Sequence, residues 1–196
     1  MAWGEAIRVG IAHYNTLDEI DKLSDVLTTL VRHAPGRKPQ SRQLRPGDMF
    51  PLDLLPDELR DGGGALERPA VVYFYPKDGT DTCTRQVVEF NRQAARFFEA
   101  GLALVGASVD TADSHREFAG QHDLLFTLLS DEDQRLATAA GVLRDYGEYG
   151  MLAGRVTFLL ERSGQVSQIW EVEDVIANVA DVLSAGVELA ACEGSE

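Results

Sequence analysis

The chain has 196 residues, 44% of them hydrophobic, which is long enough to build one principal domain around its own core. Its formal net charge of -14 opposes a nucleic-acid backbone or an anionic membrane surface, and no Lys/Arg cluster overrides that total. No apolar run approaches the roughly 18 to 20 residues that span a bilayer. We therefore expect no nucleic-acid or membrane partner and a cytoplasmic protein whose two cysteines, Cys83 and Cys192, are reduced at rest.

Residues 1–34 are predicted to be an appendage made of one strand, "AIRVGIAHY", and one helix, "NTLDEIDKLSDVLTTLVRH". One strand and one helix cannot bury their apolar faces alone. The Pro, Gly and basic residues that follow predict a linker over residues 35–43. We expect the main domain over residues 44–190 and a mobile tail over residues 191–196.

From residue 44 onward the predicted elements alternate between strands and helices. In chain order they are a short strand or turn at 50–56, a buried strand at 70–75, a helix at 83–99, a strand at 103–110, a helix at 114–122, a strand at 124–130, a short helix at 133–140, a hairpin over 155–172 and a last helix from 174 to about 189. This order predicts an α/β fold of thioredoxin-like layout, with a mixed central sheet covered by helices on both faces.

Cys83 follows the buried strand "AVVYFY" after a short polar loop, where a helical pattern begins. Unpaired backbone N–H groups and the positive end of the helix dipole favour an anion there, so they stabilise a thiolate relative to a thiol. The alternative is an inert cysteine that packs as a small hydrophobe, which is common for buried cysteines. With Pro76 and Thr80, the loop reads P-x-x-x-T-x-x-C.

Three segments carry a resemblance to the peroxiredoxins, in the branch of the bacterioferritin comigratory protein: "YFYPKDGTDTCT", "LVGASVDTADSHREFAGQHDLLFTLLSDEDQRLATAAGV" and "GRVTFLLERSGQVSQIWEV". The resemblance covers about residues 44–189. It implies a thiol peroxidase in which Cys83 attacks a peroxide and becomes a sulfenic acid. It further implies that Thr80 holds the peroxide, Pro76 shields the thiolate from water, and Arg155 directs its guanidinium at both thiolate and peroxide.

The resemblance implies a peroxide substrate and, as reductant, a thioredoxin-like protein or a low-molecular-weight thiol. The sequence has no C-x-x-C and no recognisable ligand spacing among its four histidines, so we expect no metal, and we expect no cofactor, in a monomer or homodimer. Taken alone, Thr80 is equally well explained as a helix cap, and Arg155 as a surface arginine in an ion pair. A redox-sensing or interaction module with negligible turnover, built on the same fold, is the alternative function.

Two departures from the family pattern affect the expected chemistry. Asp81-Thr82 stands where relatives commonly carry Pro-Gly, and a carboxylate near Cys83 opposes thiolate formation, so we expect slower peroxide attack unless Arg155 compensates. Val88 stands where many relatives carry a second, resolving cysteine. Cys192 is then a possible resolving thiol, and the alternative is an idle thiol at a frayed chain end.

Residues 6–31 are similar to the carboxyl end of the class V aminotransferase and cysteine desulfurase family. That resemblance covers only a final strand and helix, and none of the three lysines stands in a matching pyridoxal-phosphate context. We expect no such activity. A fusion remnant and a docking element for a sulfur-handling partner are the two interpretations left open.

Overall fold

The computed structural model of the protein describes residues 42–194. The appendage predicted for residues 1–34 and most of the linker predicted for residues 35–43 lie outside the described residues. The resemblance of residues 6–31 to aminotransferases therefore stays a prediction.

The central sheet has five strands in the order β3-β2-β1-β6-β7. β2 runs parallel to β1 and β3, whereas β6 runs antiparallel to β1 and β7. The mixed sheet of a thioredoxin-like fold is thereby confirmed. The strands are β1 (Ala70–Phe74), β2 (Ala103–Ser108), β3 (Thr127–Ser130), β6 (Val156–Leu160) and β7 (Val166–Glu171).

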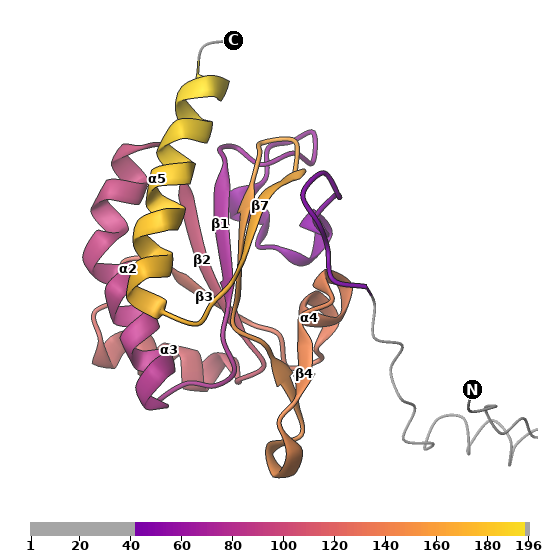
Figure 1. Cartoon of the computed structure of the whole chain (residues 1–196), viewed down its shortest axis with the longest axis vertical. Helices are drawn as coiled ribbons and strands as arrows, with labels where there is room; N and C mark the ends of the chain where they lie inside the picture. Colours follow the sequence, from indigo (N-terminus) through magenta and orange to yellow (C-terminus); the bar gives the residue numbers. More distant parts are fainter. Residues whose placement is uncertain (1–41, 195–196) are drawn as a thin grey trace, which may run out of the picture. The chain divides into compact units, whose positions relative to one another are not determined.

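Helices cover both faces of this sheet, as expected from the alternation of elements (Figure 1). One face carries α2 (Asp81–Glu99), α3 (Ala112–Gln121) and α5 (Val175–Glu193). The other carries the short α4 (Arg135–Ala140), the 3-10 turn η1 (Leu52–Leu54) and a second, two-stranded sheet made of β4 (Leu143–Asp145) and β5 (Met151–Ala153).

β1 separates two layers of the core, which explains why its sequence is apolar throughout. Val71, Tyr73 and the following Tyr75 pack toward α2 and α5, whereas Val72 and Phe74 pack toward α4 and η1. All five side chains are fully buried. Because β1 lies at the centre of the sheet, the chain that leaves its carboxyl end is anchored in the most buried part of the molecule.

Several element boundaries differ from the sequence prediction. The segment predicted as a short strand or turn at 50–56 contains the turn η1, whereas α2 starts at Asp81 rather than at Cys83 and α5 continues to Glu193. Cys192 therefore lies in the last turn of a helix, not in the predicted tail. The β4–β5 hairpin, with the turn η3 (Gly147–Tyr149), was not predicted, because three-residue strands are too short to show periodicity.

α5 also departs from the expectation that no segment is long and apolar enough to span a membrane. Among the described residues α5 is the one helix that is long and apolar enough to cross a membrane. Of its most apolar stretch, 33% is buried inside the protein. Val179, Val182 and Leu183 pack in the core beside α2. One side of α5 therefore packs against the core of the domain.

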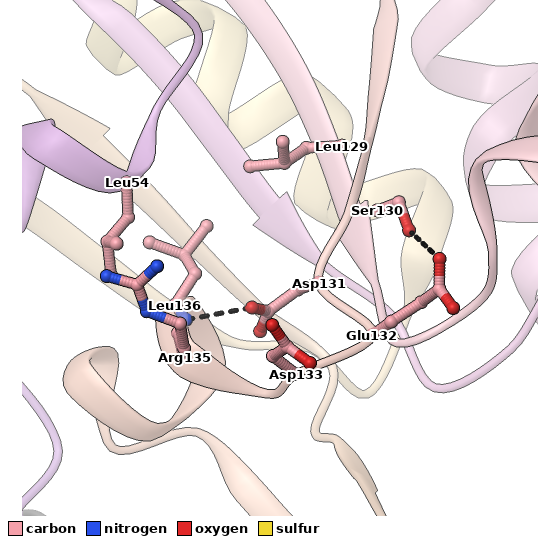
Figure 2. A pocket seen from close by; sticks show the side chains of 8 residues that line it. All are labelled: Leu54, Leu129, Ser130, Asp131, Glu132, Asp133, Arg135 and Leu136. Carbon is pink, nitrogen blue, oxygen red and sulfur yellow. Dashed lines mark hydrogen bonds between the residues drawn. The ribbon is translucent and has the colours of Figure 1, made fainter.

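Asp131 fixes the start of α4 (Figure 2). Its carboxylate accepts hydrogen bonds from the backbone N–H groups of Leu136 at 2.9 Å and Ala137 at 2.8 Å, and only 7% of the residue is exposed. These N–H groups begin a helix and have no carbonyl partner within it. The side chain therefore satisfies two buried donors that water does not reach.

We expect Asp131→Ala to lower the free energy of unfolding by about 2 kcal/mol, because it leaves two buried N–H groups without an acceptor. Urea denaturation monitored by circular dichroism measures this change. Glu132→Ala is the matched control, since the neighbouring Glu132 side chain is exposed and accepts only a 3.3 Å bond from Ser130. Equal midpoints for Asp131→Ala and Glu132→Ala would contradict the assigned role.

Candidate active site

The loop that joins β1 to α2 carries two of the predicted site residues, Pro76 and Thr80. After Phe74 the chain buries Tyr75 and Pro76, and Gly79 then turns it with φ +71°, a conformation that favours glycine. Thr80 is extended, with φ -81° and ψ 148°, and is the residue from which α2 starts. This turn leads the chain from the end of β1 into the first residues of α2.

Cys83 is the third residue of α2 and is only 1% exposed. Its position in the first turn is the one predicted from the sequence, where backbone N–H groups lack helical partners. Burial by itself disfavours a thiolate, because charge is lost from water. An ionised Cys83 therefore requires a compensating positive group nearby.

Arg155 is that group. Its Nη2 donates to Cys83 Sγ at 3.3 Å. β6 begins at the next residue, Val156, which pairs with Phe74 at the end of β1. The antiparallel register of β1 and β6 thus brings Arg155 to the first turn of α2, although 72 residues separate it from Cys83. The alternative of Arg155 as a surface arginine in an ion pair does not fit this contact.

Gln86 holds the guanidinium in place and was missed by the sequence analysis. Its Oε1 accepts a hydrogen bond from Arg155 Nη1 at 2.5 Å, and the residue is fully buried. Within the described residues its Nε2 has no hydrogen-bond partner. The signal was present in the sequence, because residues three apart on a helix lie on the same face and Gln86 follows Cys83 by three.

Thr80 does not cap α2 through its side chain. Its Oγ1 donates to Lys77 O at 3.4 Å inside the loop, while its carbonyl accepts from Thr84 N at 2.8 Å. The interpretation of Thr80 as a side-chain helix cap is therefore wrong. Its hydroxyl is exposed, three residues before Cys83, so it is available to a small ligand.

Aromatic side chains form the wall behind the thiol. Tyr73 stacks on Phe90 with ring centroids 4.2 Å apart and on Tyr75 at 5.8 Å, in the same core cluster as Cys83. Burial raises the pKa of Tyr73 well above its ordinary value, with smaller contributions from Asp78 and Cys83. The Tyr73 hydroxyl therefore stays neutral and adds no negative charge beside Cys83.

Tyr146 comes from the unpredicted β4–β5 hairpin and is 38% exposed. Burial raises the pKa of its hydroxyl, Arg155 lowers it and Cys83 raises it, so the ring lies within electrostatic range of both groups. The hairpin thus contributes an aromatic side chain to the surroundings of the thiol and guanidinium. No periodicity in the sequence pointed to it.

A hollow of about 390 Å³ lies elsewhere, at the carboxyl end of β3 (Figure 2). None of Cys83, Thr80, Pro76 or Arg155 lines it. Its walls are formed by Leu54, Leu129, Ser130, Asp131, Glu132, Asp133, Arg135 and Leu136. This hollow therefore shares no residue with the predicted thiol site.

The geometry of the thiol site agrees with a family of known proteins. The family model described as AhpC/TSA family matches residues 58–169, more than half of the chain, including Pro76, Thr80, Cys83 and Arg155. The chain belongs to the AhpC/TSA family. The resemblance to peroxiredoxins of the bacterioferritin comigratory protein branch is confirmed, because the relatives of this AhpC/TSA protein carry the names Bcp and peroxiredoxin Q.

Peroxiredoxin Bcp of Xanthomonas campestris pv. campestris is 38% identical over 118 residues, which are 59% of this chain and 74% of that protein. Chloroplastic peroxiredoxin Q of Oryza sativa subsp. japonica is 44% identical over 103 residues, 53% of this chain and 46% of the relative. The chain thus spans about half the length of the plant relatives. A solved structure of Xanthomonas campestris peroxiredoxin Q aligns with TM-score 0.59 and 36% identity, over 63% of this chain and 80% of that one.

We expect Gln86→Leu to slow the reaction of Cys83 with hydrogen peroxide about tenfold, because Arg155 loses the bond that orients it. Single-turnover peroxide consumption in a stopped-flow instrument measures the rate constant. Gln93→Leu is the matched control on the same helix, where the amide bonds to Glu89 and Arg96 and not to Arg155. A Gln86→Leu rate equal to that of the control would show that Arg155 needs no such support.

Proposed function

We propose that this protein is a thiol-dependent peroxidase that reduces hydrogen peroxide or organic hydroperoxides through a Cys83 sulfenic acid. The observation that carries the proposal is the 3.3 Å contact of Arg155 Nη2 with a buried Cys83 Sγ in the first turn of a helix. A guanidinium stays charged at physiological pH, so it favours the thiolate and stabilises negative charge on the leaving oxygen.

In the first step the Cys83 thiolate attacks one peroxide oxygen. An S–O bond forms, the O–O bond breaks, and the departing oxygen takes up a proton to leave as water or an alcohol. Cys83 is oxidised to the sulfenic acid and the peroxide is reduced. In this reaction Thr80 would hold the peroxide with its exposed hydroxyl, and Pro76, buried in the same loop, would keep water from the sulfur.

Regeneration requires a second thiol, and the position of Cys192 argues against an internal one. Val88 occupies the helix position where many relatives carry a resolving cysteine. α5 has 19 residues and is therefore roughly 27 Å long. α2 and α5 pack against each other with their starts on the same side of the domain (Figure 1), and Cys192 lies in the opposite end of α5.

That opposite end is fixed to the sheet. Glu193 Oε1 accepts from Arg162 N at 3.1 Å, in the turn after β6, whereas Arg155 at the thiol precedes the start of β6. A disulfide requires Cα atoms about 4.4–6.8 Å apart. A bond between Cys83 and Cys192 of one chain would thus require several turns of α5 to unfold.

An external thiol is therefore the proposed reductant, either a low-molecular-weight thiol or a thioredoxin-like protein. Its thiolate attacks the sulfenic sulfur, water leaves, and a mixed disulfide forms; a second thiol then releases Cys83 and carries away the oxidised product. We propose a reducing, cytoplasmic setting for this cycle, because both cysteines are free thiols.

We expect wild-type protein and Cys192→Ser to consume peroxide at equal steady-state rates with dithiothreitol, whereas Cys83→Ser consumes none above background. Serine has nearly the size of cysteine but no accessible anion at neutral pH, so the fold is kept and the nucleophile lost. A coupled peroxide assay at matched protein concentrations measures the three rates.

The same samples decide between the competing functions. One equivalent of peroxide without reductant is expected to leave a dimedone-reactive sulfenic acid on Cys83, detected by mass spectrometry. A dominant disulfide between Cys83 and Cys192 would contradict the external reductant. Formation of the sulfenic acid without catalytic turnover would instead favour the redox-sensing module.

A further inference from the structure

Asp78 lies in the middle of the loop of residues 76–80, and its side chain is only 8% exposed. Three donors converge on its carboxylate: Tyr75 Oη at 2.7 Å, Ser114 Oγ at 2.7 Å and His115 Nδ1 at 2.8 Å. Ser114 and His115 belong to α3, which follows β2. The loop beside the thiol is thus joined by a buried carboxylate to a helix more than 30 residues away in sequence.

The backbone of Asp78 makes a second attachment. Its N–H donates to Asp110 Oδ2 at 2.8 Å, and the same oxygen accepts from Ser108 Oγ at 2.6 Å at the end of β2. The next residue, Gly79, has the positive φ that lets the chain turn toward α2. Both the side chain and the main chain of Asp78 therefore fix the loop to the β2–α3 corner.

His115 has hydrogen-bond acceptors on both ring nitrogens. Nδ1 faces Asp78 Oδ2 at 2.8 Å, and Nε2 faces the carbonyl oxygen of Leu129 at 3.2 Å. A carboxylate and a carbonyl only accept hydrogen bonds, so both ring nitrogens must carry a proton. The geometry assigns a buried imidazolium, 4% exposed, that is paired with the Asp78 carboxylate.

The charge on Asp78 is consistent with this pairing. Burial alone would raise its pKa, but the hydrogen bonds from His115, Tyr75 and Ser114 together hold the pKa below its ordinary value. The Tyr75 pKa is raised, mainly by burial, so that hydroxyl keeps its proton and remains a donor. An ionised acceptor surrounded by donors is the arrangement expected for a stable buried pair.

We propose that the Asp78–His115 ion pair is a positioning device for peroxide reduction, which holds residues 76–80 so that Thr80 and Pro76 keep a fixed place beside Cys83. This inference rests on the proposed peroxidase function. Asp78 and His115 are positioning residues, because they act through the loop. The contacts of Cys83 with Arg155, and of Arg155 with Gln86, do not pass through either residue.

This separation gives a test that compares two reactions of the same thiol. Iodoacetamide needs only an accessible thiolate, whereas peroxide also needs the loop in place. In Asp78→Asn and His115→Gln we expect the rate constant with hydrogen peroxide to fall about 10- to 100-fold, as for a displaced catalytic group. The rate constant with iodoacetamide is expected not to fall, because Cys83 keeps its contact with Arg155 and a displaced loop covers the sulfur less.

His122→Gln is the matched control, since His122 is the C-cap residue of α3 and its ring makes an edge-to-face contact with Phe118, away from the loop. It should leave both rate constants unchanged. An equal fall of both rate constants in the Asp78 and His115 variants would overturn the proposal and leave only a contribution to stability. Unchanged peroxide rates would overturn it as well.

Nuclear magnetic resonance of the histidine rings in the wild-type protein tests the ion pair without any substitution. We expect both ring N–H protons of His115 to be present and slow to exchange at neutral pH. A single protonated ring nitrogen would overturn the ion pair. A wild-type protein that carries the imidazolium but does not react with peroxide would reject the proposed function and the positioning role, while the pair itself would stand.

Discussion

The contact between the Arg155 guanidinium and the Cys83 sulfur is the interaction on which the site depends. Burial of Cys83 disfavours a thiolate, whereas the guanidinium and the helix N-terminus favour it. The sheet provides this contact through its register, because β6 pairs antiparallel with β1 and starts where β1 ends. The order of strands in the core thus decides which charge faces the thiol.

Two supports flank this contact and come from different parts of the chain. On one side Gln86 fixes the guanidinium from within α2. On the other, Asp78 fixes the loop to α3 and the end of β2. Both supports use buried polar groups, which are directional and penalise displacement more strongly than apolar packing does. Thiol, guanidinium and loop are consequently held by separate contacts, so that each can be disturbed on its own.

Much of this arrangement follows from the sequence, and the rest follows from contacts that sequence patterns do not show. β1 and α2 were predicted because an apolar run and a 3.6-residue period are local signals. The position of Cys83 at the start of α2 was predicted from the same local signals.

Arg155 was predicted from the family resemblance alone, because no local pattern ties it to a residue 72 positions away. The Asp78–His115 pair and Tyr146 were missed, since they depend on how α3 and a short hairpin pack. Cys192 was assigned to a tail, because the small residues near the chain end do not show where the last helix stops.

The most direct test is the rate constant of Cys83 with hydrogen peroxide, measured by stopped flow for Cys192→Ser and for Cys192→Ser with Arg155→Met. Methionine keeps much of the arginine's apolar stem but removes the charge beside Cys83. We expect the rate constant to fall about 100-fold or more in Arg155→Met, because the group that stabilises negative charge on the leaving oxygen is lost. The same rate constant in both proteins would contradict the claim that Arg155 makes Cys83 an effective nucleophile toward peroxide.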